Sequence, residues 1–279
     1  MFNISGGRVF SVDRRSFLKL LGVSCGAAAA SGSYYFYELD WIKLEQVTLS
    51  VPKNTGSFRI VQLSDLHIHG FGFREKMALN ILGKLNPDVL VITGDFIDEP
   101  DGLRPMLSFV KEACTDREAY GVLGNWDHWV EGKGGPSGDE LAGMLCDHGV
   151  KMLINKAEPI RDGIVLIGVD DPHTRRDDVE EALRQVGSSE FKIMLAHSPE
   201  VVPNVEGRVD LLLAGHTHGG QVCLPIVGPL YVPSSLGKKY MSGLYRAKGT
   251  VVYVNRGLGW SFMPVRINCR PEITVIDLR

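Results

Sequence analysis

The chain has 279 residues, 44% of them hydrophobic, with 30 lysines and arginines against 33 aspartates and glutamates. This composition excludes a disordered chain, because the apolar residues suffice for a core, and 32 glycines without a Gly-X-Y period exclude collagen. A net charge of −3 gives no reason to expect a nucleic-acid partner, and five scattered cysteines without a CxxC pair indicate neither a disulfide framework nor a thiolate metal site.

The N-terminal segment, residues 1–37, has the features of a targeting sequence. The run Asp13-Arg14-Arg15-Ser16-Phe17-Leu18-Lys19 resembles the twin-arginine export signal, and Ala28-Ala29-Ala30 offers an A-x-A cleavage site. The uncharged stretch from Leu20 to Tyr37 is at the short end for a membrane span. The segment is therefore expected to be a signal or an N-terminal membrane anchor. Its partner would be the twin-arginine translocase, and the protein would lie in the periplasm or at the outer face of the cytoplasmic membrane.

Residues 45–279 are expected to form one domain of alternating strands and helices, an α/β chain with a largely buried sheet. Apolar runs between turn signals predict strands at Phe58–Leu63, Asp88–Thr93, Ala119–Leu123, Val165–Val169, Phe191–Ala196, Val209–Ala214, Thr250–Asn255 and Ile273–Leu278. Helical patterns occur at Arg74–Leu85, Leu103–Ala113, Asp139–Asp147 and Asp177–Val186. Residues rich in Gly, Pro and Ser predict loops at Glu131–Gly138 and Pro225–Gly243.

Five of the predicted strands end in a short polar signature. These are Ser64-Asp65-Leu66-His67, Gly94-Asp95, Gly124-Asn125-Trp126-Asp127-His128, Ala196-His197-Ser198 and Gly215-His216-Thr217-His218. In open α/β sheets the functional site lies at the carboxyl ends of strands, so these signatures are expected to converge. Carboxylate, imidazole and amide groups suit Mn, Fe or Zn ions, and the set exceeds what one ion needs. A pair of divalent ions about 3.5–4 Å apart would use all of them.

The ordered set resembles the calcineurin-like metallophosphoesterase superfamily, whose pattern is D-x-H, G-D, G-N-H-D/E, H and G-H-x-H. The resemblance runs from Phe58 to the C-terminus, and the tail around Asn255-Arg256-Gly257-Leu258-Gly259 is similar to the exported bacterial phosphodiesterase branch. It implies a four-layer α/β/β/α sandwich with a dinuclear metal site between the carboxyl edges of two sheets.

The resemblance also implies roles for single residues. Asp65, His67 and His218 would hold one metal ion, Asn125, His197 and His216 the other, and Asp95 would bridge them. A hydroxide bound to both metals would attack phosphorus, which implies a phosphohydrolase that cleaves a phosphoester or diphosphate bond. Its partner would be a phosphorylated small molecule or a lipid headgroup.

One position departs from the family pattern. The residue after the metal-binding Asn is usually a His that helps protonate the leaving group, whereas this chain has Trp126. His128 could serve as the acid instead, or the substrate could carry a leaving group that needs little protonation. The second case resembles the UDP-2,3-diacylglucosamine diphosphatases of the lipid A pathway. The third interpretation is a non-catalytic scaffold with the same fold.

Several residues outside the pattern are weaker candidates. His69, Lys238 and Lys239 are candidates for substrate contact, whereas His148 and His173 are expected to be ordinary surface or loop residues. The apolar cluster of Trp260, Phe262, Met263 and Pro264 favours core packing over a lip that rests on lipid. A membrane association remains open from this cluster and from the N-terminal segment.

Overall fold

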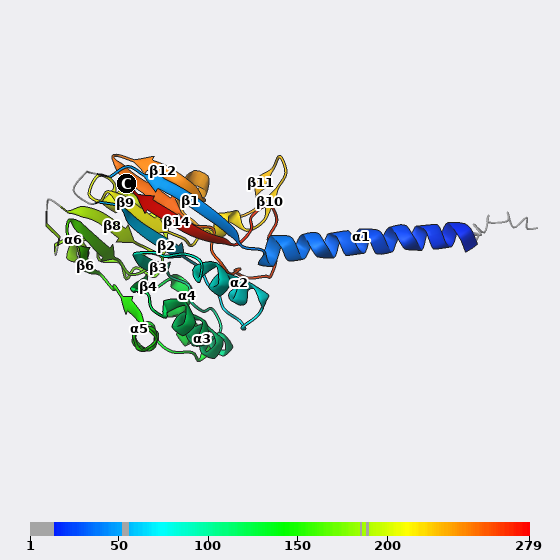
Figure 1. Cartoon of the computed structure of the whole chain (residues 1–279), viewed down its shortest axis with the longest axis horizontal. Helices are drawn as coiled ribbons and strands as arrows, with labels where there is room; N and C mark the ends of the chain where they lie inside the picture. The colour runs from blue at the N-terminus through cyan, green and yellow to red at the C-terminus, as the bar shows by residue number, and fades with distance from the viewer. Residues whose placement is uncertain (1–13, 52–55, 185, 188–189) are drawn as a thin grey trace, which may run out of the picture.

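The computed structural model describes residues 14–51, 56–184, 186–187 and 190–279. Asp13, the first residue of the signal-like motif, lies outside the described residues together with the rest of 1–13. Two six-stranded sheets form the centre of the molecule (Figure 1).

The first sheet has the strand order β1-β14-β2-β3-β4-β5. Neighbouring strands are parallel except β14 and β2, which are antiparallel. The strands are β1 (Lys43–Leu49), β2 (Phe58–Leu63), β3 (Val89–Thr93), β4 (Ala119–Val122), β5 (Val150–Met152) and β14 (Glu272–Leu278). The carboxyl ends of β2, β3 and β4 therefore lie along one edge of this sheet.

The second sheet has the order β12-β13-β9-β8-β7-β6. Its two outermost pairs are antiparallel, and the pairs between them are parallel. The strands are β6 (Lys156–Arg161), β7 (Ile164–Gly168), β8 (Phe191–Leu195), β9 (Leu211–Ala214), β12 (Gly243–Ala247) and β13 (Thr250–Val254). A separate hairpin joins β10 (Cys223–Leu224) to β11 (Gly228–Pro229).

Helices cover the outer face of each sheet. On the first sheet these are α2 (Phe73–Leu82), α3 (Leu103–Cys114) and α5 (Gly138–Asp147), and on the second α6 (Val179–Arg184) and α7 (Val202–Val205). Between the sheets lies a buried layer that includes Ile60, Val91, Leu166 and Leu213. The expected α/β/β/α sandwich is confirmed, because each sheet buries one face against helices and the other against its partner sheet.

The predicted strands are all found, with ends shifted by no more than two residues. Besides the short hairpin strands β10 and β11, the strands that the sequence did not reveal are β1, β5, β6 and β12. Strands β1, β5, β6 and β12 are the edge strands of the two six-stranded sheets. Edge strands are partly exposed, so they lack the continuous apolar run that marks an interior strand of a parallel sheet. β6 even contains Pro159, which is tolerated where one side of a strand is unpaired.

The remaining elements are short, apart from the N-terminal helix. α4 (Asn125–Trp129) begins at the end of β4, and single 3-10 turns lie at Pro100–Gly102, Val130–Lys133, Pro199–Val201, His218–Gly220 and Gly237–Tyr240. Within the predicted loops Glu131–Gly138 and Pro225–Gly243, the chain thus forms 3-10 turns and the strand β11.

Helix α1 (Arg14–Asp40) extends away from the sandwich as one rod (Figure 1). Its C-terminal turns contact the segment before β14: Arg270 donates to the hydroxyl of Tyr37 over 2.6 Å, and the Cys269 N–H donates to Glu38 over 3.1 Å. Among the residues that the structure describes, no helix is both long enough and apolar enough to cross a membrane.

Candidate metal centre

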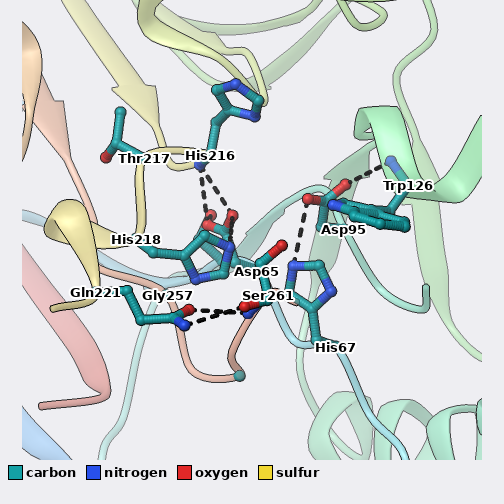
Figure 2. A network of polar contacts seen from close by, with 12 residues as sticks. Asp65, His67, Asp95, Trp126, His216, Thr217, His218, Gln221, Gly257 and Ser261 are labelled. Atoms are coloured by element: carbon teal, nitrogen blue, oxygen red, sulfur yellow. Dashed lines mark hydrogen bonds and ion pairs between the residues drawn. The ribbon is translucent and has the colours of Figure 1, made fainter. Parts of the chain in front are cut away.

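Loops at the carboxyl ends of five strands meet at one edge of the sandwich. Asp65 and His67 follow β2, Asp95 follows β3, Asn125 begins α4 after β4, His197 follows β8, and His216 and His218 follow β9. All seven side chains are buried. Figure 2 shows Asp65, His67, Asp95 and His218 facing one another across the space between the two sheets.

Two groups of potential metal ligands form there. In the first, one ligand atom from each of Asp65, His67, Asp95 and His218 lies within 4.8 Å of the others. His67 Nε2 is 3.4 Å from Asp95 Oδ2, and His218 Nε2 is 3.4 Å from Asp65 Oδ1. The donor set of two carboxylates and two imidazoles is one that divalent first-row metals accept.

The second group consists of Asp95, His197 and His216, again within 4.8 Å. His197 Nε2 lies 3.2 Å from Asp95 Oδ2 and 3.1 Å from Asn125 Oδ1. Because Asp95 belongs to both groups, its carboxylate lies between two places where a metal ion could bind. That is the arrangement a bridging ligand requires.

Polar contacts of the outer ring nitrogens hold two of the imidazoles in place. His197 Nδ1 pairs with the carbonyl oxygen of Thr93 at 2.9 Å, and His67 Nδ1 faces Asp98 Oδ2 at 3.4 Å. Such partners fix ring orientation and raise the basicity of a metal-binding imidazole. Asp98 was not singled out in the sequence, because no motif position marks it.

Backbone amides hold the two carboxylates in place. The N–H of His216 donates to Oδ1 and Oδ2 of Asp65 over 2.9 and 3.1 Å, and the N–H of Trp126 donates to Asp95 Oδ1 over 2.9 Å (Figure 2). A carboxylate fixed by amides keeps its remaining lone pairs directed at the centre. The site is therefore largely preorganised by the loops themselves.

The charged groups at the site shift one another's pKa values. Burial disfavours the protonated form of His67, but Asp95 and Asp98 outweigh it and raise the pKa of this imidazole to about 9. Burial raises the pKa of Asp65, with Asp95 adding to the effect, whereas burial and the neighbouring His197 lower the pKa of His216 to about 3. Both ring nitrogens of His67 are buried and have only carboxylate oxygens at 3.4 Å beside them, and the buried Nε2 of His216 makes no hydrogen bond. These residues fit divalent metal ions, which would supply the positive charge and accept the free lone pairs.

The ligand residues adopt an unusual backbone conformation. Asp65, His67, Asp95, His216 and His218 have φ of 47, 38, 53, 69 and 49°, in the left-handed region that side chains with a Cβ rarely adopt. Such strain persists only where the surrounding structure enforces it, and it is concentrated at functional sites. The sharp turns it produces send Asp65 and His67, or His216 and His218, toward the same centre.

A cavity of about 320 Å³ opens above the two groups. Its floor includes Asp95, Asn125, His216 and His218, and its walls include Trp126, Trp129, His173, Tyr231 and Phe262. A substrate phosphoryl group would reach the metal ligands through this cavity, and the rest of the substrate would contact aromatic side chains.

The weaker candidates lie elsewhere. His128 Nε2 is 2.8 Å from Asp170 Oδ1; burial disfavours its charged form, but Asp170 outweighs it and raises the pKa of the ring. His69 stacks on Trp260 with ring centroids 4.2 Å apart, and Lys238 and Lys239 belong to the turn Gly237–Tyr240. None of these four candidates is among the residues that line the cavity.

Two further sets of residues line the cavity, and the expectation for one of them is wrong. His173 lies in a loop, as expected, and it also lines the cavity, with its ring centroid 5.3 Å from that of His216. Phe262 and Met263 do not pack in the core: they are 73% and 55% exposed and line the cavity. Neither position carries a motif, because both are brought to the site by loops from the second sheet and from the segment before β14.

Comparison with known proteins identifies relatives of this chain. The family model of the calcineurin-like phosphoesterases matches residues 58–220, which include all seven residues. The chain is 32% identical to the uncharacterized metallophosphoesterase YkuE of Bacillus subtilis (strain 168), over 96% of this chain and 98% of that protein. It is 28% identical to the phosphodiesterase YaeI of Escherichia coli (strain K12), over 96% of this chain and 99% of the relative.

Proposed function

The chain belongs to the calcineurin-like phosphoesterase family, and we propose that it is a hydrolase that uses two divalent metal ions to cleave phosphodiester or diphosphate bonds. The observation that carries this proposal is the place of Asp95 in both groups of potential ligands. A carboxylate shared in this way serves a pair of ions, and paired ions are the usual catalysts of phosphoester hydrolysis.

Each side chain has a proposed role. Asp65, His67 and His218 hold one ion, Asn125, His197 and His216 hold the other, and Asp95 bridges them. When bound, the ions lower the pKa of a water and neutralise charge on the phosphoryl oxygens. The chain keeps the ligands aligned through the amides of Trp126 and His216.

The proposed leaving group is one that needs little protonation. Trp126 occupies the position of the histidine that family members commonly carry, and His128 is paired with Asp170. General acid catalysis is worth about 10²–10⁴-fold for a poor leaving group, so an alkoxide would depart slowly here. A diphosphate or an activated diester fits better. The name of the relative YaeI, a phosphodiesterase, supports the diester.

A substrate panel tests the proposal. Protein loaded with Mn²⁺ is assayed with bis-p-nitrophenyl phosphate, a sugar-nucleotide diphosphate and a simple alkyl phosphomonoester, and we expect the first two to be hydrolysed much faster than the third. Equal rates for all three would contradict the proposed leaving group. A loaded protein without any turnover would point to a scaffold.

Replacement of Asp95 tests the metal assignment. Asp95→Asn should lower turnover by about 100-fold or more, because one bridging charge is lost from both metal sites. The control is Asp147→Asn, which alters an exposed carboxylate at the end of α5 and should leave the rate unchanged. Full activity of Asp95→Asn would exclude the bridging role.

We also propose that the N-terminal segment directs export by the twin-arginine route. The support is the run Arg14-Arg15-Ser16-Phe17-Leu18-Lys19. In a host with an active twin-arginine translocase, the full chain should reach the periplasm or the outer face of the membrane, and the double substitution Arg14→Lys with Arg15→Lys should retain it in the cytoplasm. Export of the double variant, or export in a host without the translocase, would contradict the proposal.

A further inference from the structure

We propose that the substrate is a phosphorylated lipid, whose apolar chain lies along the aromatic wall of the cavity while the protein rests on a bilayer. This inference depends on the proposed function and specifies its substrate class. It begins with the cavity, whose volume of about 320 Å³ greatly exceeds that of a phosphoryl group. The walls that a phosphoryl group would not fill include Trp126, Trp129, Leu230 and Phe262. An apolar wall of this kind binds an apolar part of a ligand.

The apolar wall continues onto the outer surface. Leu230 and Tyr231 are largely exposed, and beyond them lies the tip of the β10–β11 hairpin, where Ile226 is fully exposed and Val227 is 64% exposed. Large contiguous apolar surfaces are uncommon on soluble proteins and mark places where a partner or a membrane binds. The hairpin and the cavity wall thus form one apolar face, which we call the apolar rim: Ile226, Val227, Leu230, Tyr231, Phe262 and Met263.

Two residues of the apolar rim are held in a costly backbone conformation. Ile226 has φ of 70° and Phe262 has φ of 64°. For a β-branched or bulky residue this region is strongly disfavoured, and neither side chain gains burial in return. Glycine or asparagine would relieve the strain. Exposed Ile and Phe at such positions are explained if they become buried in something outside this chain.

The two loops that form the apolar rim are fastened together. The side chain of Gln221, just before the hairpin, donates to the carbonyl oxygen of Ser261 over 3.0 Å and accepts from the N–H of Ser261 over 2.9 Å (Figure 2). Asn268 donates to the carbonyl oxygen of Cys223 over 2.8 Å. The hairpin and the segment that carries Phe262 therefore present a single surface.

The position of α1 favours a bilayer as the occupant of this surface. The hydroxyl of Tyr35 donates to the carbonyl oxygen of Pro264, and that of Tyr34 donates to Asn268 Oδ1 over 3.5 Å. The helix therefore leaves the sandwich at the end that carries the hairpin (Figure 1). Its described outer part exposes the apolar side chains Phe17, Leu18, Leu20, Leu21 and Val23.

The charges around the apolar rim also suit a lipid surface. The ammonium group of Lys238 lies beside Gly228 of β11, and Lys239 follows it. Apolar and aromatic side chains flanked by lysines bind at the boundary between acyl chains and anionic headgroups. On such a surface the phosphoryl group of a lipid would enter the cavity first and face the metal ligands, and its chain would lie along the apolar wall toward the bilayer.

The reaction is an ordinary hydrolysis. The hydroxyl of one water forms the new bond to phosphorus, the bond from phosphorus to the leaving oxygen breaks, and the second proton of the water ends on the leaving group or in solvent. No oxidant or further reactant is needed.

Two probes with one leaving group, the first soluble in water and the second carried in vesicles, separate this inference from the proposed function. Full-length protein loaded with Mn²⁺ is assayed with methyl p-nitrophenyl phosphate and with dodecyl p-nitrophenyl phosphate, the latter carried in vesicles of phosphatidylcholine and phosphatidylglycerol. We expect kcat/KM for the dodecyl probe to be at least tenfold higher, because the vesicle presents this probe at the surface on which the apolar rim binds. No hydrolysis of either probe would refute the proposed phosphodiesterase activity, and the inference of a lipid phosphodiester with it. Hydrolysis of both at equal rates would refute the lipid inference and leave the proposed function standing.

Variants of the apolar rim test whether the alkyl chain of the substrate binds there. Phe262→Ser and the double substitution Ile226→Ser with Val227→Ser should each lower the dodecyl-to-methyl ratio toward one. These side chains are exposed, so thermal unfolding should be unchanged. Leu244→Ser is the matched control, because Leu244 is an exposed leucine on the edge strand β12 outside the apolar rim, and it should keep the ratio of the unmodified protein. An unchanged ratio in both rim variants would overturn the inference.

Discussion

At the scale of single residues, the site combines two histidines whose pKa values are shifted in opposite directions. His67 carries a pKa of about 9 because Asp95 and Asp98 overcome its burial, whereas His216 has a pKa of about 3 because burial and His197 disfavour its charge. In the metal-free protein at pH 7, His67 is therefore protonated and His216 is neutral. A metal ion that binds His67 must displace its proton.

The raised pKa of His67 predicts that the metal affinity depends on pH. Between pH 6 and pH 9 the Mn²⁺ affinity should rise by about tenfold per pH unit for each proton released, because fewer protons compete as the pH approaches the pKa of His67. Calorimetric titration in buffers of different ionisation enthalpy measures both the affinity and the number of protons released. An affinity that is independent of pH, with no proton release, would show that His67 does not bind the metal.

At the scale of elements, one buried arginine organises the segment between β13 and β14. Arg266 is 1% exposed and donates to the carbonyl oxygens of Gly259, Cys269 and Arg256 over 3.0, 2.9 and 2.9 Å. One of its nitrogens also lies 3.5 Å from His218 Nδ1. The segment that holds Phe262 is thus fixed to a ligand of the candidate metal centre through this guanidinium.

Substitution of Arg266 should therefore affect both stability and the site. Arg266→Met should lower the free energy of unfolding by about 2–4 kcal/mol, since several buried carbonyl groups lose their donor. Urea denaturation measures this loss, and the Mn²⁺ affinity of the folded fraction should fall as well. The exposed Arg104→Met on α3 serves as the control and should change neither quantity. If Arg266→Met were as stable as the unmodified protein and bound Mn²⁺ equally well, the segment between β13 and β14 would not depend on this guanidinium.

Glycine at the end of β3 is a second element-scale requirement. Gly94 has φ of 78°, and a Cβ there would lie 2.7 Å from both Gly124 N and His197 Nδ1. Gly94→Ala should displace His197 and lower metal affinity by at least about tenfold, because strain and steric overlap act together. Gly143→Ala, on the exposed face of α5 with open space around it, is the control and should leave affinity intact. Equal affinities for the two variants would contradict this prediction.

At the scale of the whole molecule, the candidate centre joins the two sheets. Its ligands come from β2, β3 and β4 of one sheet and from β8 and β9 of the other. Bound metal should therefore stabilise the whole sandwich. At 100 times its dissociation constant an ion contributes about 2.7 kcal/mol, which corresponds to roughly 5–10 °C in Tm.

Scanning calorimetry with Mn²⁺ and with a chelator tests this coupling. The unmodified protein should show the higher Tm in Mn²⁺, and the difference should shrink in Asp95→Asn, which keeps the fold and loses a shared ligand. A Tm that does not respond to the metal in the unmodified protein would mean that the ions do not link the sheets.

The interior strands and the order of the polar signatures could be read from the sequence. A strand such as Val89–Thr93 is apolar throughout because both faces are buried, so it is recognisable without its neighbours. The residues that follow it must turn sharply, which explains the recurrent glycine before a polar ligand, as in Gly94-Asp95. The candidate metal ligands were therefore predictable as a group, and their convergence follows from parallel topology.

What only the tertiary structure decided depends on contacts between distant segments. The edge strand β1 pairs with β14 from the other end of the chain, and its partly exposed residues give no local signal. His173 and Phe262 reach the cavity because two loops fold over it, whereas His128, which lies within the motif, turns to Asp170. The sequence by itself determined the chemistry of the centre, since ligand types and strand ends are local properties. The walls of the cavity are set by packing across the whole chain, and so only the folded structure reveals the apolar rim.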